Sequence, residues 1–119
     1  MFARCVTIPL KPNAVAEFNR AFEKEVLPLL QKQKGFRDEL TLVATDGSEV
    51  IGISLWDQKE DAEAYHRTSY PEVQKLLAKV IDRIPRVQTY KVIEGTPRVQ
   101  TYEVSTSTVH KVAARGVSG

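Results

Sequence analysis

The stretch Ile53–Val73, ISLWDQKEDAEAYHRTSYPEV, predicts the fold of this chain because a strand runs directly into a helix there. Its first residues alternate between two faces, which is the period of a strand. Asp57 and Glu60 then have the spacing of a capping box, with Asp57 as the N-cap, so a helix is expected to start at the strand's end. A bend is expected at Ser69–Pro71, because proline cannot continue a helix without a break.

A second strand precedes this stretch and forms a hairpin with it. The turn is Asp46-Gly47, a strong signal for a tight hairpin connection. The arms are expected over Phe36–Thr45 and Val50–Asp57. In the first arm, the apolar residues are expected to face inward and the polar ones outward: Leu40, Leu42 and Ala44 inward; Arg37, Glu39, Thr41 and Thr45 outward. In the second arm, one face holds Ile51, Ile53 and Leu55 and the other holds Val50, Gly52, Ser54 and Trp56.

The N-terminal part predicts one strand and one helix. Residues 2–9 alternate with Phe2, Arg4, Val6 and Ile8 on one face. Apolar residues at helical spacing then predict an amphipathic helix from Pro12 or Asn13 to about Gln33. Pro28 is expected to kink this helix or loosen its last turns, and Gly35 is placed to stop it.

After the bend, a further helical segment is expected to bury its apolar residues, namely Val73, Leu76, Leu77, Val80, Ile81 and Ile84. A strand pattern follows over Arg86–Ile93. The segments PRVQTYKV (Pro85–Val92) and PRVQTYEV (Pro97–Val104) are near-identical at a period of twelve residues. We expect Arg98–Val104 to extend the dimer interface by adding a strand to a sheet edge of the partner. The alternative is that either copy of the repeat can fill the one strand position, which leaves the other copy as a loop. One domain over residues 1–104 and a polar tail over 105–119 are therefore predicted.

The order of elements is β-α-β-β-α-β plus one extra strand, which predicts an α+β, ferredoxin-like subunit with an antiparallel sheet and both helices on one face. The other sheet face still has apolar residues, and leaving them in water would favour aggregation. A second copy of the chain laid sheet to sheet would cover them, so a homodimer through the sheet face is expected.

Composition excludes several classes of protein. The 119 residues favour a single domain. The 17 Lys and Arg exceed the 15 Asp and Glu by only two, an excess equal to Lys111 and Arg115 of the tail, so neither nucleic acid nor a membrane surface is an expected partner. No apolar run is long enough for a membrane span, and no signal-peptide pattern precedes the first strand. One cysteine, Cys5, allows no internal disulfide framework. A cytoplasmic protein is expected.

The helix PNAVAEFNRAFEKEVLPLLQKQKGF, the hairpin and above all the stretch from Trp56 to His66 resemble the antibiotic biosynthesis monooxygenase (ABM) family of dimeric α+β barrels. The resemblance spans roughly residues 2–93. It implies a ferredoxin-like subunit, a dimer formed through the sheets and a pocket between sheet and helices. Some members oxygenate polycyclic aromatic compounds with no metal or flavin, whereas others cleave haem or act on quinones.

Five residues are candidates for a site. Trp56 is either a core filler beneath the helices or an aromatic wall for a planar substrate. Tyr65, His66 and Tyr70 gather at the expected bend; His66 is the candidate base that removes a proton from a phenolic or enolic substrate, with Tyr65 beside it. An exposed helix histidine is the simpler reading. Arg4 is the candidate to hold a substrate oxyanion, or else it pairs with an acidic side chain.

The leading hypothesis is a cofactor-independent monooxygenase acting on a small aromatic or quinone-like compound. The carbanion left by deprotonation could react with oxygen directly. The alternative is a non-catalytic homodimer that binds a small apolar ligand. No P-loop, GxGxxG, HExxH or GxSxG motif is present, so neither a metal nor a nucleotide cofactor is expected.

Overall fold

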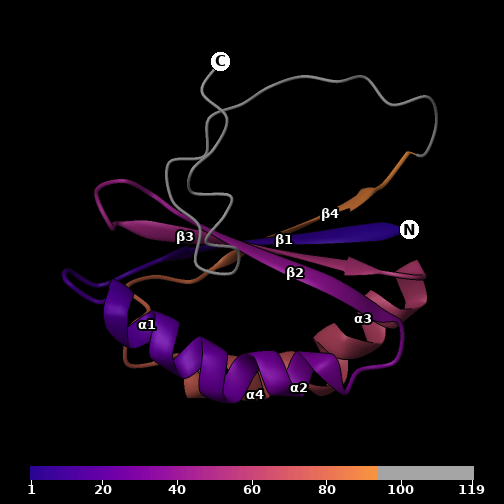
Figure 1. Cartoon of the computed structure of the whole chain (residues 1–119), viewed down its shortest axis with the longest axis horizontal. Coiled ribbons are helices and arrows are strands. Elements are labelled where there is room, and N and C mark those ends of the chain that lie inside the picture. The colour runs from indigo at the N-terminus through magenta and orange to yellow at the C-terminus, as the bar shows by residue number, and fades with distance from the viewer. Residues whose placement is uncertain (94–119) are drawn as a thin grey trace.

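A computed structural model describes residues 1–93 of the chain, and within them a single four-stranded sheet is covered by helices (Figure 1). The elements follow one another as β1 (Phe2–Pro9), α1 (Val15–Ala21), the π-helical turn η1 (Phe22–Val26), α2 (Leu27–Gln31), β2 (Phe36–Val43), β3 (Glu49–Trp56), α3 (Lys59–Thr68), α4 (Tyr70–Leu76) and β4 (Arg86–Lys91).

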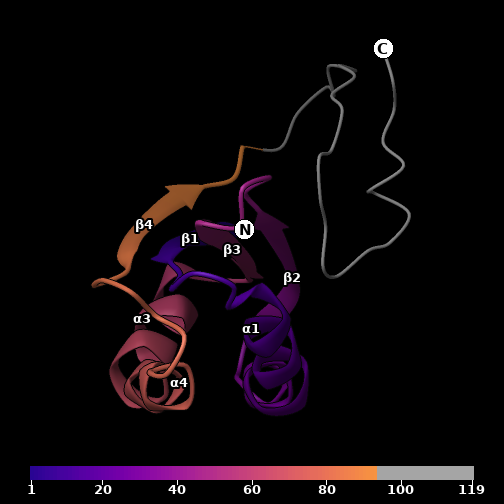
Figure 2. The same ribbon diagram turned by 90° about the vertical axis from the view of Figure 1, so that its left-hand side faces the viewer.

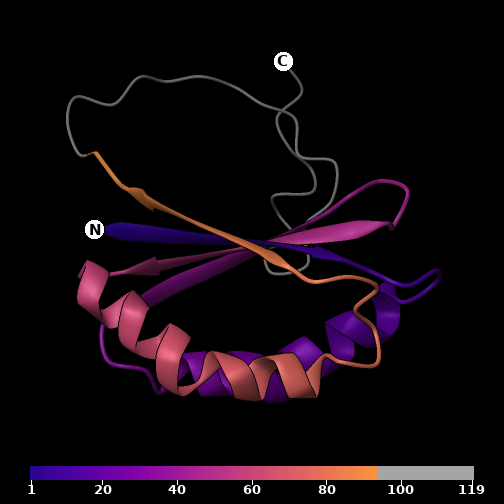
Figure 3. The ribbon, with the colours of Figure 1, turned by 180° about the vertical axis from the view of Figure 1, so that it is seen from behind.

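The strand order is β2-β3-β1-β4, and every neighbouring pair is antiparallel. All the helices lie on one face of this sheet, α1 to α2 beneath the β2 side and α3 to α4 beneath the β4 side (Figure 2). Seen from behind, α3 and α4 run along the layer below β1 and β4 (Figure 3). The expected α+β, ferredoxin-like architecture is confirmed.

The first helical stretch contains a widened turn just before its proline. Leu27 N–H donates to the carbonyl of Phe22, five residues back instead of four. Pro28 has no N–H for an α-helical bond, and its ring would crowd the carbonyl of Lys24; the π-helical turn accommodates both effects. The loosening expected at Pro28 is therefore present, one turn earlier than the proline itself.

Gly35 was predicted to stop this helix, but α2 already ends at Gln31 with Lys32 as its C-cap, and Gly35 lies in the turn that leads into β2. Gly35 has φ +79°, in the left-handed region that glycine adopts without strain. Its carbonyl accepts a 2.8 Å hydrogen bond from Asp57 N–H, and a side chain here would overlap that of Asp61. The close approach ties the start of β2 to the start of α3.

The phase predicted for β2 was wrong. Glu39 and Thr41 are buried on the helix side, with 5% and 0% of their surface exposed, while Leu40 and Leu42 belong to the opposite face. A register irregularity between Phe36 and Asp38 marks where the strand enters the sheet. Polar residues therefore point into the layer between sheet and helices.

Two further expectations about α3 and α4 were wrong. The N-cap of α3 is Gln58 without a side-chain cap, and Asp57 instead forms a 3.1 Å ion pair with Arg37 on the strand entry. α4 ends at Leu76, and Ile84 is 87% exposed because it lies in the irregular segment beyond the helix. The bend at Ser69 is confirmed: the residue separates α3 from α4.

The second copy of the repeat (97–104) and the tail (105–119) lie outside the described residues, so their predicted roles stay predictions. Within residues 1–93, none of the helices has the length and apolarity needed to cross a membrane.

Candidate functional site

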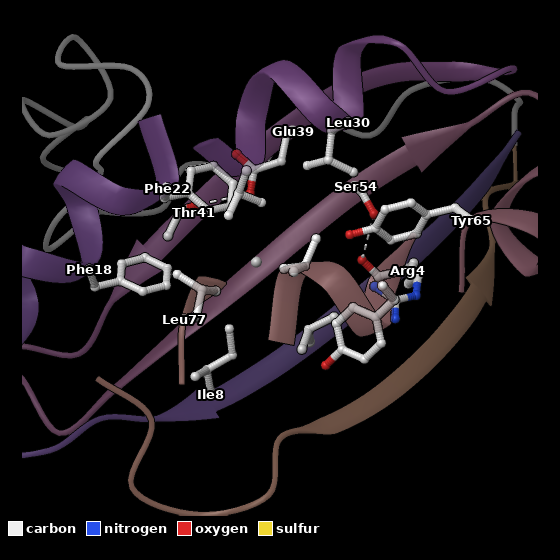
Figure 4. Close-up of a pocket in the computed structure, with 15 residues that line it drawn as sticks. Arg4, Ile8, Phe18, Phe22, Leu30, Glu39, Thr41, Ser54, Tyr65 and Leu77 are labelled. Carbon is white, nitrogen blue, oxygen red and sulfur yellow. Dashed lines mark hydrogen bonds between the residues drawn. The ribbon is translucent and has the colours of Figure 1, made fainter. Parts of the chain in front are cut away.

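A small cavity lies between the sheet and the helices, with a volume of about 50 Å³. Its walls come from all layers of the fold: Arg4, Val6, Ile8, Phe18, Phe22, Val26, Leu30, Glu39, Thr41, Gly52, Ser54, Tyr65, Tyr70, Val73 and Leu77. Apolar side chains form most of the wall, and polar groups project from the strands and from α3 (Figure 4). Such an apolar hollow with few convergent polar groups is typical of a small-molecule site.

Cross-strand register explains how the polar groups meet. On the helix-facing side, Ser54 of β3 is the register partner of both Arg4 of β1 and Glu39 of β2. Successive strands are about 4.8 Å apart, so the guanidinium and the carboxyl start from backbones about 10 Å apart on one row. The next row brings Thr41 beside Gly52.

Arg4 is a buried cation held by aromatic rings. Only 3% of its surface is exposed, and its guanidinium carbon lies 4.3 Å from the Tyr70 ring centre and 5.1 Å from that of Tyr65. Burial lowers the pKa of Arg4, and the two tyrosines partly offset that effect, but arginine stays charged. No ion pair joins Arg4 to a carboxylate within residues 1–93. The expected alternative, an acidic partner, is absent there.

His66 also contacts the guanidinium of Arg4. Arg4 Nη2 donates a 2.9 Å hydrogen bond to His66 Nδ1, and the imidazole stacks on Tyr70 with 5.3 Å between ring centres. Burial, and then the charge of Arg4, lower the pKa of His66. The ring is therefore neutral, with its proton on Nε2. His66 does not line the cavity; it lines an open groove of about 520 Å³ together with Arg4, Ala62, Glu63, Arg67, Val87 and Thr89.

Tyr65 and Tyr70 line the cavity, and Trp56 packs against the ring of Tyr65 without lining the cavity itself. Burial raises the pKa of Tyr65 to about 12, and burial also raises the pKa of Tyr70. Both hydroxyls are therefore neutral hydrogen-bond donors at physiological pH. Trp56 is fully buried, packs 5.2 Å from the Tyr65 ring, and donates from Nε1 to Ser54 Oγ at 2.9 Å. The structure thus brings Arg4, Tyr65, Tyr70 and His66 into one cluster.

Glu39 is a cavity residue that the sequence interpretation missed. Thr41 Oγ1 donates a 2.7 Å hydrogen bond to Glu39 Oε2, while Oε1 is buried without a hydrogen-bond partner among the described residues. Burial raises the pKa of this carboxyl to about 7, although the Thr41 hydrogen bond works in the opposite direction. A carboxyl that titrates near neutrality can both accept and return a proton.

The hairpin register could have revealed Glu39. Extending the pairing back from the Asp46-Gly47 turn places Glu39 opposite Ser54 and Thr41 opposite Gly52. Directly paired residues share a face, and Trp56, on the same face as Ser54, was already expected beneath the helices. The strand pairing set by the turn is therefore better evidence than side-chain polarity for which residues of β2 face the helices.

Within residues 1–93 no group of three or more His, Cys, Asp or Glu side chains could hold a metal ion. The charged groups at the cavity are one guanidinium and one carboxyl. This set can hold an oxyanion at one end and accept a proton at the other.

The fold and this site define an α+β protein with a polar cluster buried between sheet and helices, and known structures share its fold. A monooxygenase from the gene ActVA-Orf6 of Streptomyces coelicolor, in complex with the ligand nanaomycin D, superposes with a TM-score of 0.69 at 16% identity, over 82% of this chain and 92% of that one. A putative antibiotic biosynthesis monooxygenase from Bordetella bronchiseptica gives 0.68 at 14% identity, over 78% and 97%.

SnoaB from Streptomyces nogalater, a cofactor-independent oxygenase, gives a TM-score of 0.67 at 13% identity, covering 82% of this chain and 97% of that one. No family model matches this sequence, and no curated protein matches it. The chain therefore has the fold of the ABM proteins, which confirms the resemblance at the level of the fold.

Proposed function

We propose that this protein is a cofactor-independent monooxygenase of the ABM type that acts on a small aromatic or quinone-like compound. The observation that supports it most is the Arg4 guanidinium, which is buried at the cavity in contact with two tyrosine rings and has no carboxylate partner within residues 1–93. A desolvated cation at a cavity favours a ligand that develops negative charge there. A phenolate or enolate is such a ligand, and the rings suit its planar body.

The reaction needs only the substrate and molecular oxygen. A proton leaves the hydroxyl or activated carbon of the substrate, and Arg4 holds the resulting oxyanion. The electron-rich ring carbon then attacks O₂. For a methylene carbon, one oxygen atom becomes the new carbonyl, and the other leaves as water with the two hydrogens that the carbon loses. The substrate supplies all four electrons, so the balance requires no flavin or metal.

The remaining candidates take supporting parts in this proposal. The rings of Tyr65 and Tyr70 both contact Arg4 and carry neutral hydroxyls, and Trp56 packs against the ring of Tyr65. His66 was the candidate base. Because its Nδ1 accepts from Arg4 outside the cavity, we now propose it as a positioning residue that holds the guanidinium in place.

The cavity must widen to admit a ring. Its 50 Å³ holds a few water-sized groups, whereas an engineered cavity that binds benzene measures about 150 Å³. Part of the wall is Phe22 and Val26 of the π-helical turn, a type of irregularity found often at functional sites. We propose that the π-helical turn moves away from the sheet when substrate enters, which enlarges the cavity.

Oxygen uptake with a panel of anthrones, hydroquinones and phenols tests the function. We expect the wild-type protein to consume oxygen with at least one of them, and His66→Ala to lower that rate because Arg4 loses its acceptor. No uptake with any compound, alongside tight binding of an unaltered ligand, would contradict the proposal and favour a non-catalytic binding protein.

A homodimer through the open sheet face is a second part of the proposal. The face away from the helices includes Cys5, Leu40 and Ile53, which are register neighbours across three strands. We propose that a second copy covers this face and that the protein works in the cytoplasm, where a single cysteine stays reduced.

Sedimentation at micromolar concentration checks the dimer. We expect about twice the chain mass for the wild type and for Gln74→Asp, which adds a carboxylate on the helix side. Ile53→Asp places the same group on the open sheet face and should give a monomer. A monomeric wild-type protein would contradict the dimer, and a dimer that survives Ile53→Asp unchanged would show that the interface lies elsewhere.

A further inference from the structure

We infer that Glu39 is the group that accepts the proton of the bound hydroxyl compound, with its free oxygen Oε1 as the acceptor atom. This inference rests on the proposed function for the nature of the ligand, but the assignment of the residue comes from the cavity itself. It adds a catalytic carboxylate on β2 to a site whose other polar groups are Arg4, Thr41, Ser54, Tyr65 and Tyr70.

The first argument is that Glu39 Oε1 is buried without a hydrogen-bond partner among the described residues. A buried acceptor without a partner destabilises the folded protein, and a carboxyl that is 95% buried in an apolar layer is not placed there by stability alone. Thr41 satisfies only Oε2. Oε1 belongs to a residue that lines the cavity and is left for the hydroxyl of a ligand.

The second argument is the space beside the carboxyl. Gly52 lies across from Thr41 on the neighbouring strand, and a Cβ added to it would come 3.5 Å from Glu39 Oε2. The missing side chain therefore leaves the cavity open next to this carboxyl. Gly52 does not have a positive φ, so backbone conformation does not require glycine here.

The third argument is the separation of charges. Glu39 and Arg4 lie on the same cross-strand row with Ser54 between them, and no ion pair joins them. In Figure 4 they occupy different ends of the cavity, with apolar side chains such as Leu77 alongside. A ligand that gives a proton to Glu39 spreads the resulting negative charge toward Arg4.

The step itself is a plain proton transfer. The substrate O–H bond breaks, its electron pair stays on the oxygen, and the proton binds Oε1 to give a neutral carboxylic acid. The new anion lies in the field of Arg4. Glu39 and the ligand together keep one proton, because two anions side by side in a buried site disfavour each other.

Proton uptake on binding para-nitrophenol tests this assignment without any turnover. At about pH 9 the free probe and free Glu39 are both ionised, so a complex that keeps one proton must take it from the buffer. Calorimetry in two buffers of different ionisation enthalpy measures that number. We expect about one proton per probe for the wild type and for the surface control Glu72→Gln, and none for Glu39→Gln.

Gly52→Ala is the matched variant for the cavity. It keeps Glu39 but fills the space beside it, so we expect probe affinity to fall at least tenfold while the protein stays folded. Absence of probe binding to the wild type, absence of proton uptake, or the same uptake in Glu39→Gln would each overturn the inference. Oxygen uptake that survives Glu39→Gln would support the proposed function and contradict the role of Glu39. Proton uptake that depends on Glu39 without any oxygen uptake would support the role of Glu39 and contradict the proposed function.

Discussion

Arg4→Met is expected to lower the rate of oxygen uptake by about 10²- to 10³-fold, the usual loss when one donor to a developing oxyanion is removed. Methionine matches the unbranched part of the arginine side chain as far as Nε and can pack against Tyr65 and Tyr70 without a charge. The fold should tolerate it, because replacing a buried charge by an apolar residue is often neutral for stability. The measurement is the rate with the best substrate of the panel, beside a thermal melt.

Arg37→Met is the matched control for this prediction. Arg37 lies on the same sheet but is exposed and paired with Asp57, so its loss should leave the rate unchanged. A second readout reports the electrostatics directly. Because the charge of Arg4 lowers the pKa of His66, the His66 pKa followed by NMR should rise in Arg4→Met. A folded Arg4→Met protein with the wild-type rate would contradict the role of Arg4.

The free energy of unfolding is expected to fall by about 3 kcal/mol between about pH 4.5 and just above pH 7, owing to Glu39 alone. Burial raises the pKa of this carboxyl from 4.5 to about 7 in the folded protein. Between those values the folded state binds more protons than the unfolded state, so stability decreases as pH rises. The contribution is complete below the unfolded pKa and is lost once pH passes the folded pKa.

Urea unfolding at a series of pH values checks this effect as a difference between proteins. Glu39→Gln cannot titrate, so its stability relative to the wild type should increase by that amount across the window. Glu72→Gln, an exposed carboxyl on α4, should not change the profile. In Thr41→Val the window should extend to higher pH, because the Thr41 hydrogen bond lowers the pKa of Glu39. Parallel curves for Glu39→Gln and the wild type would show that Glu39 does not titrate in this range.

The order of strands and helices followed from the sequence because local signals act within a few residues. The turn at Asp46-Gly47 and the break at Ser69 appear where they were expected, and Gly35 has the expected positive φ, although the helix ends before it, at Gln31. Strand alternation placed Arg4 on one face with Phe2, Val6 and Ile8, and the structure shows that the helices cover this face.

The phase of β2 followed from its pairing with β3 and not from the polarity of its side chains, and only the tertiary structure decided what the inner face of β2 contacts. Single side chains predicted Leu40 inward and Glu39 outward, because transfer of apolar groups from water usually sets the phase of a strand. Pairing with β3 fixes the opposite phase, since a residue of β2 must share its face with its partner across the ladder. The carboxyl of Glu39 is buried because the hairpin register outweighs its own solvation, and the long-range packing of the helices over this face then encloses the polar cavity.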